Sequence, residues 1–259
     1  MDGSELIFHN RRTIEAHRKI GILYICTGAY VVFWQDFHRS MEKKFCLNSS
    51  LEFFVFTDSD HIEGDEKKNV HRIFVPCKGW PYDTLFRFDI FIESEQIYTD
   101  CDYLFFFNAN YICCRKVKEE EFLPSSTEKL VFTIHPGMYN KQNTEFTYER
   151  NPESLAYIPD GEGRYYIAGG LNGGKTSDYM TLVHKLSDRI HKDLDNDIIA
   201  IYHDESHINK YLYESYDSPV YKLLSPGYCY PEGWKIPYRK ILMLREKDKY
   251  IDIKTIKGE

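Results

Sequence analysis

Three short apolar runs constrain the fold of this chain more than any other feature of its sequence. They occupy residues 20–26, 53–57 and 103–107, and polar or small residues follow each of them directly. A run without polar alternation is typical of a strand buried on both faces, as in a parallel sheet that helices cover on either side. The sequence therefore predicts an α/β protein.

Segments with helical periodicity separate these runs. Residues 31–45 carry apolar side chains at mostly three-to-four spacing, which predicts an amphipathic helix between the first two strands and hence a βαβ unit. Ser177 is expected to cap the longest helix of the chain. Further strands are predicted at residues 70–75 and 130–134, and further helices at residues 84–92, at residues 177–192 and from about residue 206.

The chain of 259 residues contains no internal repeat and no linker rich in Gly and Ser. We therefore predict one domain over residues 20–245, an N-terminal extension over residues 1–19 and a basic C-terminal tail over residues 246–259 that is mobile without a ligand. No stretch reaches the roughly 18 uninterrupted apolar residues of a membrane span, and the extension lacks the apolar core of a signal peptide. Cysteines inside apolar runs favour a reducing compartment, so we expect a cytoplasmic protein.

The charge balance argues against nucleic acid as a partner. Lys and Arg number 33 and Asp and Glu number 40, which gives a formal net charge of −7 at pH 7. A protein that wraps a phosphate polymer carries the opposite balance, because Lys and Arg make its phosphate contacts. We expect neither nucleic acid binding nor a membrane span.

Two segments that follow predicted strands are candidates for a ligand site, because ligands of open α/β sheets bind outside the carboxyl ends of the strands. In the first segment, Gly28 lets the backbone approach a ligand and Tyr30 offers a ring for stacking, although this signal alone favours a plain strand-to-helix turn. In the second segment, Asn108 and Asn110 end the most apolar strand. Amides bind phosphate or ribose but are poor ligands for Mg²⁺ or Mn²⁺, and they also end strands without any further role.

Two other patterns suggest metal ligands. Asp100 and Asp102 form an Asp-x-Asp pattern, but they lie at the amino end of a strand, so we interpret them as solvating residues. His203 and His207 stand four residues apart, as in a zinc hydrolase, but the Glu of zinc peptidases is absent directly after the first His. This alternative remains open to metal analysis.

The carboxylates of Asp204 and Glu205 lie near the predicted start of a helix. Such a pair is well placed as an oriented, buried group beside a cleft, and capping of the helix is the simpler alternative. Residues 165–174 combine two tyrosines with four glycines. Small residues after a strand allow tight packing or leave room for a ligand.

Seven motifs in the second half of the chain resemble, in this order, glycosyltransferase family 6. This family contains the histo-blood-group A and B transferases, the α-1,3-galactosyltransferase and the Forssman synthase. The resemblance covers nearly all of residues 20–234 and includes the short bacterial members in particular. The motifs are His135-Pro136-Gly137-Met138-Tyr139, Phe146-Thr147-Tyr148-Glu149-Arg150, Ala156-Tyr157-Ile158-Pro159, Tyr165-Tyr166, Ala168-Gly169-Gly170, His203-Asp204-Glu205-Ser206-His207-Ile208-Asn209-Lys210-Tyr211 and Leu224-Ser225-Pro226.

This resemblance implies the GT-A type nucleotide-diphosphosugar transferase fold, a Rossmann-like mixed sheet flanked by helices. It also implies retaining α-1,3 transfer of galactose or N-acetylgalactosamine from a UDP-sugar, with Glu205 on the family's catalytic carboxylate. Tyr202 departs from the Trp that is usual in vertebrate relatives. The positions that match donor-binding residues are Ile25, Cys26, Thr27, Tyr30, Trp80, Arg87, Asn108, Asn110, Ala168, Gly169, Gly170, Arg245 and Lys247. The positions that match the acceptor pocket are His135, Thr147, Tyr202 and Asp204.

Asn108 and Asn110 stand where vertebrate relatives carry Asp-x-Asp, so the chain resembles the bacterial branch that works without a metal ion. No cofactor is expected. A departing UDP still develops negative charge, which the protein must then stabilise with positive groups. Arg245 and Lys247 match the place where the tail of family members closes over UDP, and we predict that Lys247 takes this role.

Donor choice depends on Ala168, Gly169 and Gly170, which in the family lie against the C2 substituent of the donor sugar. Glycine at the third position leaves space for an acetamido group, so we expect UDP-N-acetylgalactosamine (UDP-GalNAc) as the donor. The expected acceptor is an oligosaccharide with a terminal β-galactoside, fucosylated as in H-type glycans. Two alternatives remain open: transfer from UDP-galactose, and a non-catalytic glycan-binding module on the same scaffold.

Overall fold

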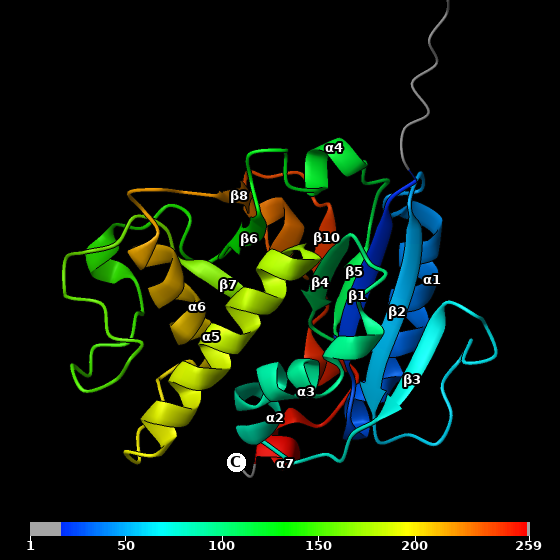
Figure 1. Ribbon diagram of the computed structural model, residues 1–259, viewed down its shortest axis with the longest axis horizontal. Coiled ribbons are helices and arrows are strands. Elements are labelled where there is room, and N and C mark those ends of the chain that lie inside the picture. Colours follow the sequence, from blue (N-terminus) through cyan, green and yellow to red (C-terminus); the bar gives the residue numbers. More distant parts are fainter. Residues whose placement is uncertain (1–16, 258–259) are drawn as a thin grey trace, which may run out of the picture.

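The computed structural model describes residues 17–257 and arranges them in two β-sheets with helices packed around them (Figure 1). The larger sheet has seven strands in the order β3-β2-β1-β4-β7-β6-β8, and the smaller sheet has three in the order β5-β10-β9. Residues 1–16, most of the predicted N-terminal extension, lie outside the described residues. The mixed sheet and its helices confirm the α/β architecture.

The bounds of the elements follow the sequence periods closely in the first half of the chain. The predicted helix at residues 31–45 is a 3₁₀ helix followed by an α-helix. The strands are β1 (Lys19–Ile25), β2 (Ser50–Thr57), β3 (Val70–Phe74), β4 (Tyr103–Phe107), β5 (Tyr111–Cys113), β6 (Leu130–Ile134), β7 (Ile167–Lys175), β8 (Tyr221–Leu224), β9 (Tyr230–Pro231) and β10 (Leu242–Leu244). The α-helices are α1 (Trp34–Lys44), α2 (Tyr82–Leu85), α3 (Arg87–Glu93), α4 (Glu119–Phe122), α5 (Thr176–Leu194), α6 (His203–Glu214) and α7 (Ile253–Lys257). The 3₁₀ helices are η1 (Gly28–Phe33), η2 (Glu95–Ile97), η3 (Asn143–Glu145), η4 (Pro226–Cys229) and η5 (Lys247–Lys249).

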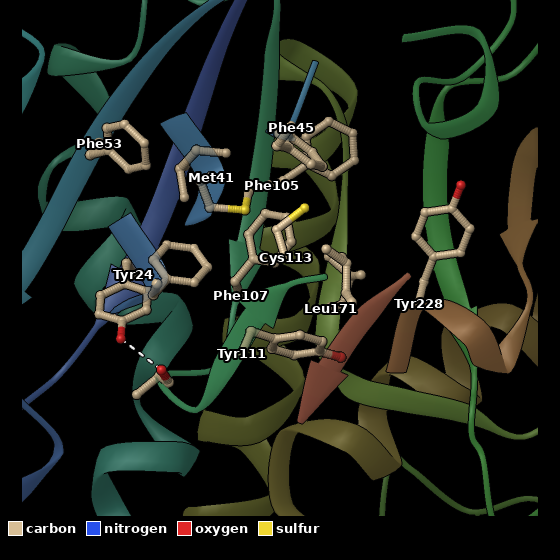
Figure 2. Close-up of a cluster of buried hydrophobic side chains, with 14 of the residues drawn as sticks. Tyr24, Met41, Phe45, Phe53, Phe105, Phe107, Tyr111, Cys113, Leu171 and Tyr228 are labelled. Atoms are coloured by element: carbon tan, nitrogen blue, oxygen red, sulfur yellow. Dashed lines mark hydrogen bonds between the residues drawn. The ribbon is translucent and has the colours of Figure 1, made fainter. Parts of the chain in front are cut away.

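The order of the strands reverses at β1. This strand pairs in parallel with both β2 and β4, so β2 and β3 lie on one side of it and β4 on the other. The hydroxyl of Tyr24 on β1 donates a hydrogen bond of 2.7 Å to the carbonyl of Ala109, which follows β4 (Figure 2). Ligands of such sheets bind in the crevice at the carboxyl ends of the two strands that flank the reversal.

Both faces of the central strands are buried, as the apolar runs predict. Tyr24 and Phe107 pack with Phe37 of α1 on one face, in the cluster of Figure 2. Their neighbours Leu23 and Phe106 pack on the other face, with side chains of α3 and α5. Burial of one such side chain contributes about 1.5–3 kcal/mol relative to exposure, so burial on two sides holds these strands at the centre of the molecule.

The glycine-rich segment is itself a strand, β7, and not a segment that follows a strand. It lies between β4 and β6 and pairs antiparallel with both. A Cβ on Gly173 would lie 2.3 Å from the carbonyl oxygen of Leu104, and a Cβ on Gly174 would lie 2.3 Å from the carbonyl oxygen of Lys129. Only glycine permits this close approach of the neighbouring backbones.

The start of α5 differs from the prediction. The helix begins at Thr176, and Ser177 lies inside its first turn and does not cap it. The Thr176 backbone N–H donates to the Asp102 carbonyl at 3.1 Å, and the Thr176 hydroxyl donates to the Cys101 carbonyl at 2.6 Å. The residues just before β4 therefore bond the first residue of the helix, and no side chain caps it.

After β10 the chain continues through η5 into the short helix α7. Ile253 and Ile256 of α7 pack against the buried cluster on the α1 face of the sheet. Within residues 17–257, no helix combines the length and the apolar character needed to cross a membrane. All seven cysteines lie in this part of the chain and are free thiols.

Candidate active site

A cavity of about 180 Å³ opens at the carboxyl ends of β1 and β4, where the strand order reverses. Residues of η1, α2, α3 and the C-terminal tail complete its walls. Its lining residues are Ile25, Thr27, Tyr30, Trp80, Asp83, Thr84, Arg87, Phe106, Asn108, Ala109, Lys247 and Ile256. Seven of the residues predicted to bind the donor are among them.

The turn after β1 contributes Thr27 and Tyr30 to the wall of the cavity. Gly28 has φ of +54°, a conformation that favours glycine. Its N–H donates a hydrogen bond of 2.8 Å to Asp58 Oδ1 at the end of β2. The Lys247 ammonium lies 5.0 Å from the centroid of the Tyr30 ring, within the range of a cation–π contact. The tail and the first turn thus meet at the cavity.

Cys26, also predicted on the donor side, is buried and does not line the cavity. Its side chain is fully buried, and burial raises the pKa of its thiol to about 12. Its N–H donates to the Phe56 carbonyl at 2.9 Å, and its carbonyl accepts from the Thr57 hydroxyl at 2.8 Å. Cys26 therefore supports the end of β1 as a neutral, packed side chain.

The two asparagines after β4 have different surroundings. Asn108 lines the cavity. Asn110 is buried, and its Nδ2 donates to the Arg245 backbone carbonyl at 2.6 Å. The backbone carbonyl of Asn110 accepts from the Arg245 backbone N–H at 2.9 Å. Asn108 thus faces the cavity, and Asn110 faces the C-terminal tail.

Arg245 and Lys247, the two predicted tail cations, also have different surroundings. Arg245 is buried, its Nη1 lies 2.5 Å from Asp36 Oδ2, and its guanidinium lies 4.8 Å and 4.3 Å from the ring centroids of Phe33 and Tyr250. Lys247 lines the cavity. Arg245 therefore attaches the tail to the domain, and Lys247 brings positive charge to the cavity.

Glu205 lies in the first turn of α6, because this helix begins at His203 and not near Ser206. Its carboxylate accepts a hydrogen bond of 2.7 Å from the Gly169 backbone N–H and one of 2.9 Å from the Tyr166 hydroxyl. Burial raises the pKa of Glu205 to about 7, although both hydrogen bonds favour the ionised form. A carboxyl group with this pKa exchanges its proton near neutral pH, as functional carboxyl groups commonly do.

Arg87 and Asp204 form a buried ion pair beside Glu205. The Arg87 Nη1 lies 3.0 Å from Asp204 Oδ2 and donates to the Gly169 carbonyl at 3.2 Å, and the guanidinium lies 4.1 Å from the centroid of the Phe106 ring. Burial raises the pKa of Asp204 to about 6, and Arg87 opposes this rise. Asp204, predicted at the acceptor pocket, thus faces a cation that lines the cavity.

Ala168, Gly169 and Gly170 lie between the cavity wall and Glu205. Ala168 is buried, and a Cβ on Gly169 would lie 3.0 Å from the Glu205 Cβ. A Cβ on Gly170 would lie 2.8 Å from the amide nitrogen of Asn108. A side chain at position 170 would therefore displace the Asn108 amide, which lines the cavity.

The three other residues predicted at the acceptor pocket surround Tyr166. The His135 ring stands perpendicular to the Tyr166 ring with centroids 5.6 Å apart, and the Thr147 carbonyl oxygen lies 3.4 Å from the Tyr166 hydroxyl. Tyr202, directly before α6, is 43% exposed. Burial raises the pKa of Tyr166, with smaller contributions from Glu205 and Tyr202, and burial lowers the pKa of His135 to about 4. The imidazole is therefore neutral at pH 7.

The His and Asp residues of the two alternative metal patterns do not come together at one site. His203 packs edge-on against Trp80 with ring centroids 5.6 Å apart, whereas His207 is buried with Nε2 3.7 Å from Asp193 Oδ2. In residues 17–257, no group of three or more His, Cys, Asp or Glu side chains is arranged to hold a metal ion. Asp102 lines a separate groove of about 640 Å³ at the amino end of β4, the edge at which the sequence placed it.

Two residues of this site received no role from the sequence. Tyr166 binds the Glu205 carboxylate, and Asn209 binds the backbone of Ile167 and of Glu205. Both residues lie inside the motifs that carry the family resemblance. Ile167, which bonds Asn209, is the first residue of β7, a strand that the sequence did not predict.

The site combines a cavity at the carboxyl ends of the strands, two cations in its wall and a carboxyl group with a near-neutral pKa. Arg87 and Lys247 suit an anionic ligand such as a diphosphate. The Glu205 carboxylate suits positive charge that develops at a reacting carbon, as in glycosyl transfer. Gly169 and Gly170 let these two parts approach each other.

Comparison with known proteins gives a consistent result. The model of glycosyltransferase family 6 matches residues 7–255. The chain is 34% identical over 230 residues to the O-antigen biosynthesis glycosyltransferase WbnI of Escherichia coli, and the match covers 89% of this chain and 95% of that protein. These findings confirm the resemblance that the motifs indicate and, with the mixed seven-stranded sheet, the GT-A type fold.

Vertebrate relatives are similar over most of the chain. The histo-blood group ABO system transferase 1 of Rattus norvegicus is 33% identical over 234 residues, which cover 86% of this chain and 64% of that protein. The globoside alpha-1,3-N-acetylgalactosaminyltransferase 1 of Gallus gallus is 30% identical over 223 residues, which cover 82% of this chain and 62% of that protein. The chain thus spans less than two thirds of the length of these two relatives.

Proposed function

Because the chain belongs to glycosyltransferase family 6, we propose that it transfers N-acetylgalactosamine from UDP-GalNAc to a terminal β-galactoside. The new linkage is α-1,3 and retains the anomeric configuration of the donor. The acceptor carries a 2-linked fucose, as in H-type glycans, and the reaction needs no metal ion. The name of one vertebrate relative, a globoside α-1,3-N-acetylgalactosaminyltransferase, supports this donor sugar and this linkage.

The observation that carries this proposal is the position of Glu205 relative to the cavity. Gly169 contacts Glu205 through its N–H, and Gly170 contacts Asn108 of the cavity wall. Only two residues of one strand therefore separate the predicted nucleotide site from the predicted catalytic carboxylate. A nucleotide sugar in the cavity brings its anomeric carbon toward this carboxylate.

Two retaining routes use one carboxylate in this position. In a double displacement, a Glu205 oxygen attacks C1 as the C1–O bond to UDP breaks, and UDP leaves with the electron pair. The acceptor hydroxyl then attacks C1, the bond to Glu205 breaks, and the hydroxyl proton passes to a phosphate oxygen of UDP. In front-side attack, Glu205 stabilises the oxocarbenium-like carbon without a bond, and the acceptor enters from the face that UDP leaves.

Metal independence is supported by the chemistry of the donor set. Mg²⁺ and Mn²⁺ prefer oxygen ligands with negative charge, which Asn108 and Asn110 do not provide. Lys247 lines the cavity and is the group that we assign to the charge of the departing diphosphate.

The donor preference follows from the absence of a side chain at Gly170. The amide of Asn108 would lie 2.8 Å from any Cβ at this position. Without that Cβ, Asn108 stays against β7, and the cavity keeps the space that an acetamido group requires. A larger residue would move Asn108 into that space and favour UDP-galactose.

Competition between UDP-GalNAc and UDP-galactose on 2′-fucosyllactose tests the proposal, with the linkage of the product assigned by NMR. We expect the N-acetylgalactosaminyl product in α-1,3 linkage. The variant Glu205→Gln keeps the shape of the side chain but loses its charge, so its kcat should fall about 100-fold or more. A galactosyl product would show that UDP-galactose is the donor, the first alternative. Glycan binding without UDP release from either donor would indicate a non-catalytic binding module.

A further inference from the structure

Asn209 lies one helical turn beyond Glu205 on α6 and is 1% exposed. Its Oδ1 accepts a hydrogen bond of 2.8 Å from the Ile167 backbone N–H. Its Nδ2 donates to the Ile167 carbonyl at 3.0 Å and to the Glu205 carbonyl at 2.9 Å. All three hydrogen bonds of this buried amide are therefore made with backbone groups.

The Asn209 amide takes the place of a neighbouring strand at Ile167. On one side of β7, Ile167 pairs with Ile134 of β6. On the other side, β4 pairs only with residues 171–175 of β7 and ends before Ile167. The backbone N–H and carbonyl of Ile167 are left without a strand partner there, and buried backbone groups require one. Asn209 supplies both the acceptor and the donor.

The contact of Asn209 with Ile167 and the contact of Glu205 with Gly169 join the same helix to the same strand. Ile167 and Gly169 are two residues apart on β7, so their N–H groups point to the same side of the strand. Asn209 and Glu205 are four residues apart on α6, so their side chains share a face of the helix. Asn209 binds Ile167 and Glu205 binds Gly169, so one register satisfies both pairs.

We propose that Asn209 is a positioning residue that fixes the register of α6 on β7 and thereby holds the Glu205 carboxylate against the Gly169 amide. A slide of the helix along the strand breaks the two bonds to Ile167 and the bond to Gly169 together. The predicted effect on turnover rests on the proposed function. The predicted effect on the Glu205 carboxylate rests on the contacts alone.

The first experiment titrates Glu205 by carboxyl-¹³C NMR of protein labelled in glutamate, with the signal assigned by its loss in Glu205→Gln. The Gly169 N–H favours the ionised form, so Asn209→Ala should raise the pKa of Glu205 by about 1. The matched control is Ile208→Val, which changes a fully buried neighbour on the same helix and removes no hydrogen bond. The titratable groups that face Glu205 stay the same in both variants: Asp204, Arg87, Tyr166, Tyr111 and Cys229.

The second experiment compares steady-state constants. Asn209→Ala should lower kcat at least tenfold and change KM for UDP-GalNAc less than twofold, because the nucleotide site is left intact; Ile208→Val should change neither constant. If Asn209→Ala does not fold, Asn209→Ser retains one hydrogen-bonding group and serves in both experiments. An unchanged titration of Glu205 overturns the proposal, as does an equal loss of kcat in Ile208→Val. If the unmodified chain uses no UDP-sugar, the proposed function fails, and the titration still decides the role of Asn209.

Discussion

Asn110 and Arg245 bind each other through two hydrogen bonds. The Asn110 side-chain Nδ2 donates to the Arg245 backbone carbonyl, and the Arg245 backbone N–H donates to the Asn110 backbone carbonyl. Arg245 also pairs with Asp36 of α1. The turn after β4, the helix α1 and the tail therefore meet at the buried Arg245 side chain. Lys247 follows two residues later at the cavity, so the two asparagines after β4 differ in role: Asn108 belongs to the cavity wall, and Asn110 belongs to the attachment of the tail.

The variant Asn110→Asp tests this difference. It removes the Nδ2 donor and places a carboxylate beside the Arg245 carbonyl, so we expect activity to fall at least about tenfold, in line with the loss of a buried hydrogen bond. Added Mn²⁺ should not restore activity, because the new carboxylate faces the tail. UDP release with and without Mn²⁺ measures both effects. Asn196→Asp loses a similar amide-to-carbonyl bond, an exposed one just after the end of α5, and should behave like the unmodified chain. Stimulation of Asn110→Asp by Mn²⁺ would contradict this assignment.

Lys247→Ala should lower kcat/KM by about 10- to 100-fold, the cost of one charge-assisted hydrogen bond to phosphate. Its melting temperature should stay close to that of the unmodified chain, since Lys247 lies in a short surface turn. The control is Lys249→Ala in the same turn, because Lys249 pairs with Glu232 and Glu246 and does not line the cavity. Equal kinetics in Lys247→Ala and Lys249→Ala would assign the diphosphate to another cation, such as Arg87.

Gly170→Ala should shift donor preference toward UDP-galactose by roughly 5- to 100-fold, since crowding in a close-packed site costs about 1–3 kcal/mol. The added methyl group displaces the Asn108 amide into the cavity. The ratio of kcat/KM for the two donors, measured on one preparation, is independent of any loss of folded protein. An unchanged ratio in Gly170→Ala would show that Gly170 does not determine the choice of donor.

The pH dependence of kcat reports on Glu205. In the proposed mechanism its ionised form is the active one, so kcat should rise with pH through an apparent pKa of about 7. Tyr166→Phe removes a hydrogen bond that favours the ionised form, and the profile should therefore move to higher pH. A profile that stays in place would show that Tyr166 does not act on this titration.

The stability of the fold should fall with rising pH through the same titration of Glu205, whereas kcat rises. Because burial raises the pKa of Glu205 in the folded state above its usual value, its protonated form stabilises the fold at low pH, and this contribution is lost as the pH rises through about 7. Glu205→Gln has no such titration. The melting temperature of the unmodified chain should consequently fall relative to that of Glu205→Gln between about pH 5 and 8.

The strands at residues 20–26, 53–57 and 103–107 were predictable because both of their faces are buried, which makes the apolar runs continuous. The strand β7 was not predictable, because four of its nine residues are glycine and carry no side chain to form a period. Its glycines reflect the close approach of β4 and β6, which only the folded chain reveals. The strands β9 and β10 are too short to form a pattern.

The site was predictable where a motif marks it and was not where a long-range contact decides it. The family motifs point to Glu205, and the carboxyl-end rule points to Asn108. The direction of Asn110 depends on Arg245, 135 residues further along the chain, and no local pattern contains that contact. The capping prediction for Ser177 failed for the same reason, since the first residue of α5, Thr176, bonds the carbonyls of Cys101 and Asp102 just before β4.

Release of UDP from UDP-GalNAc in the presence of 2′-fucosyllactose and excess EDTA is the most direct test of a metal-independent transferase. Asn108 and Asn110 offer no anionic ligands, and Lys247 supplies the positive charge at the cavity. We predict the same rate with EDTA as with added Mn²⁺, and a rate lower by about 100-fold or more in Glu205→Gln under both conditions. Strict dependence of UDP release on Mn²⁺ would contradict this account.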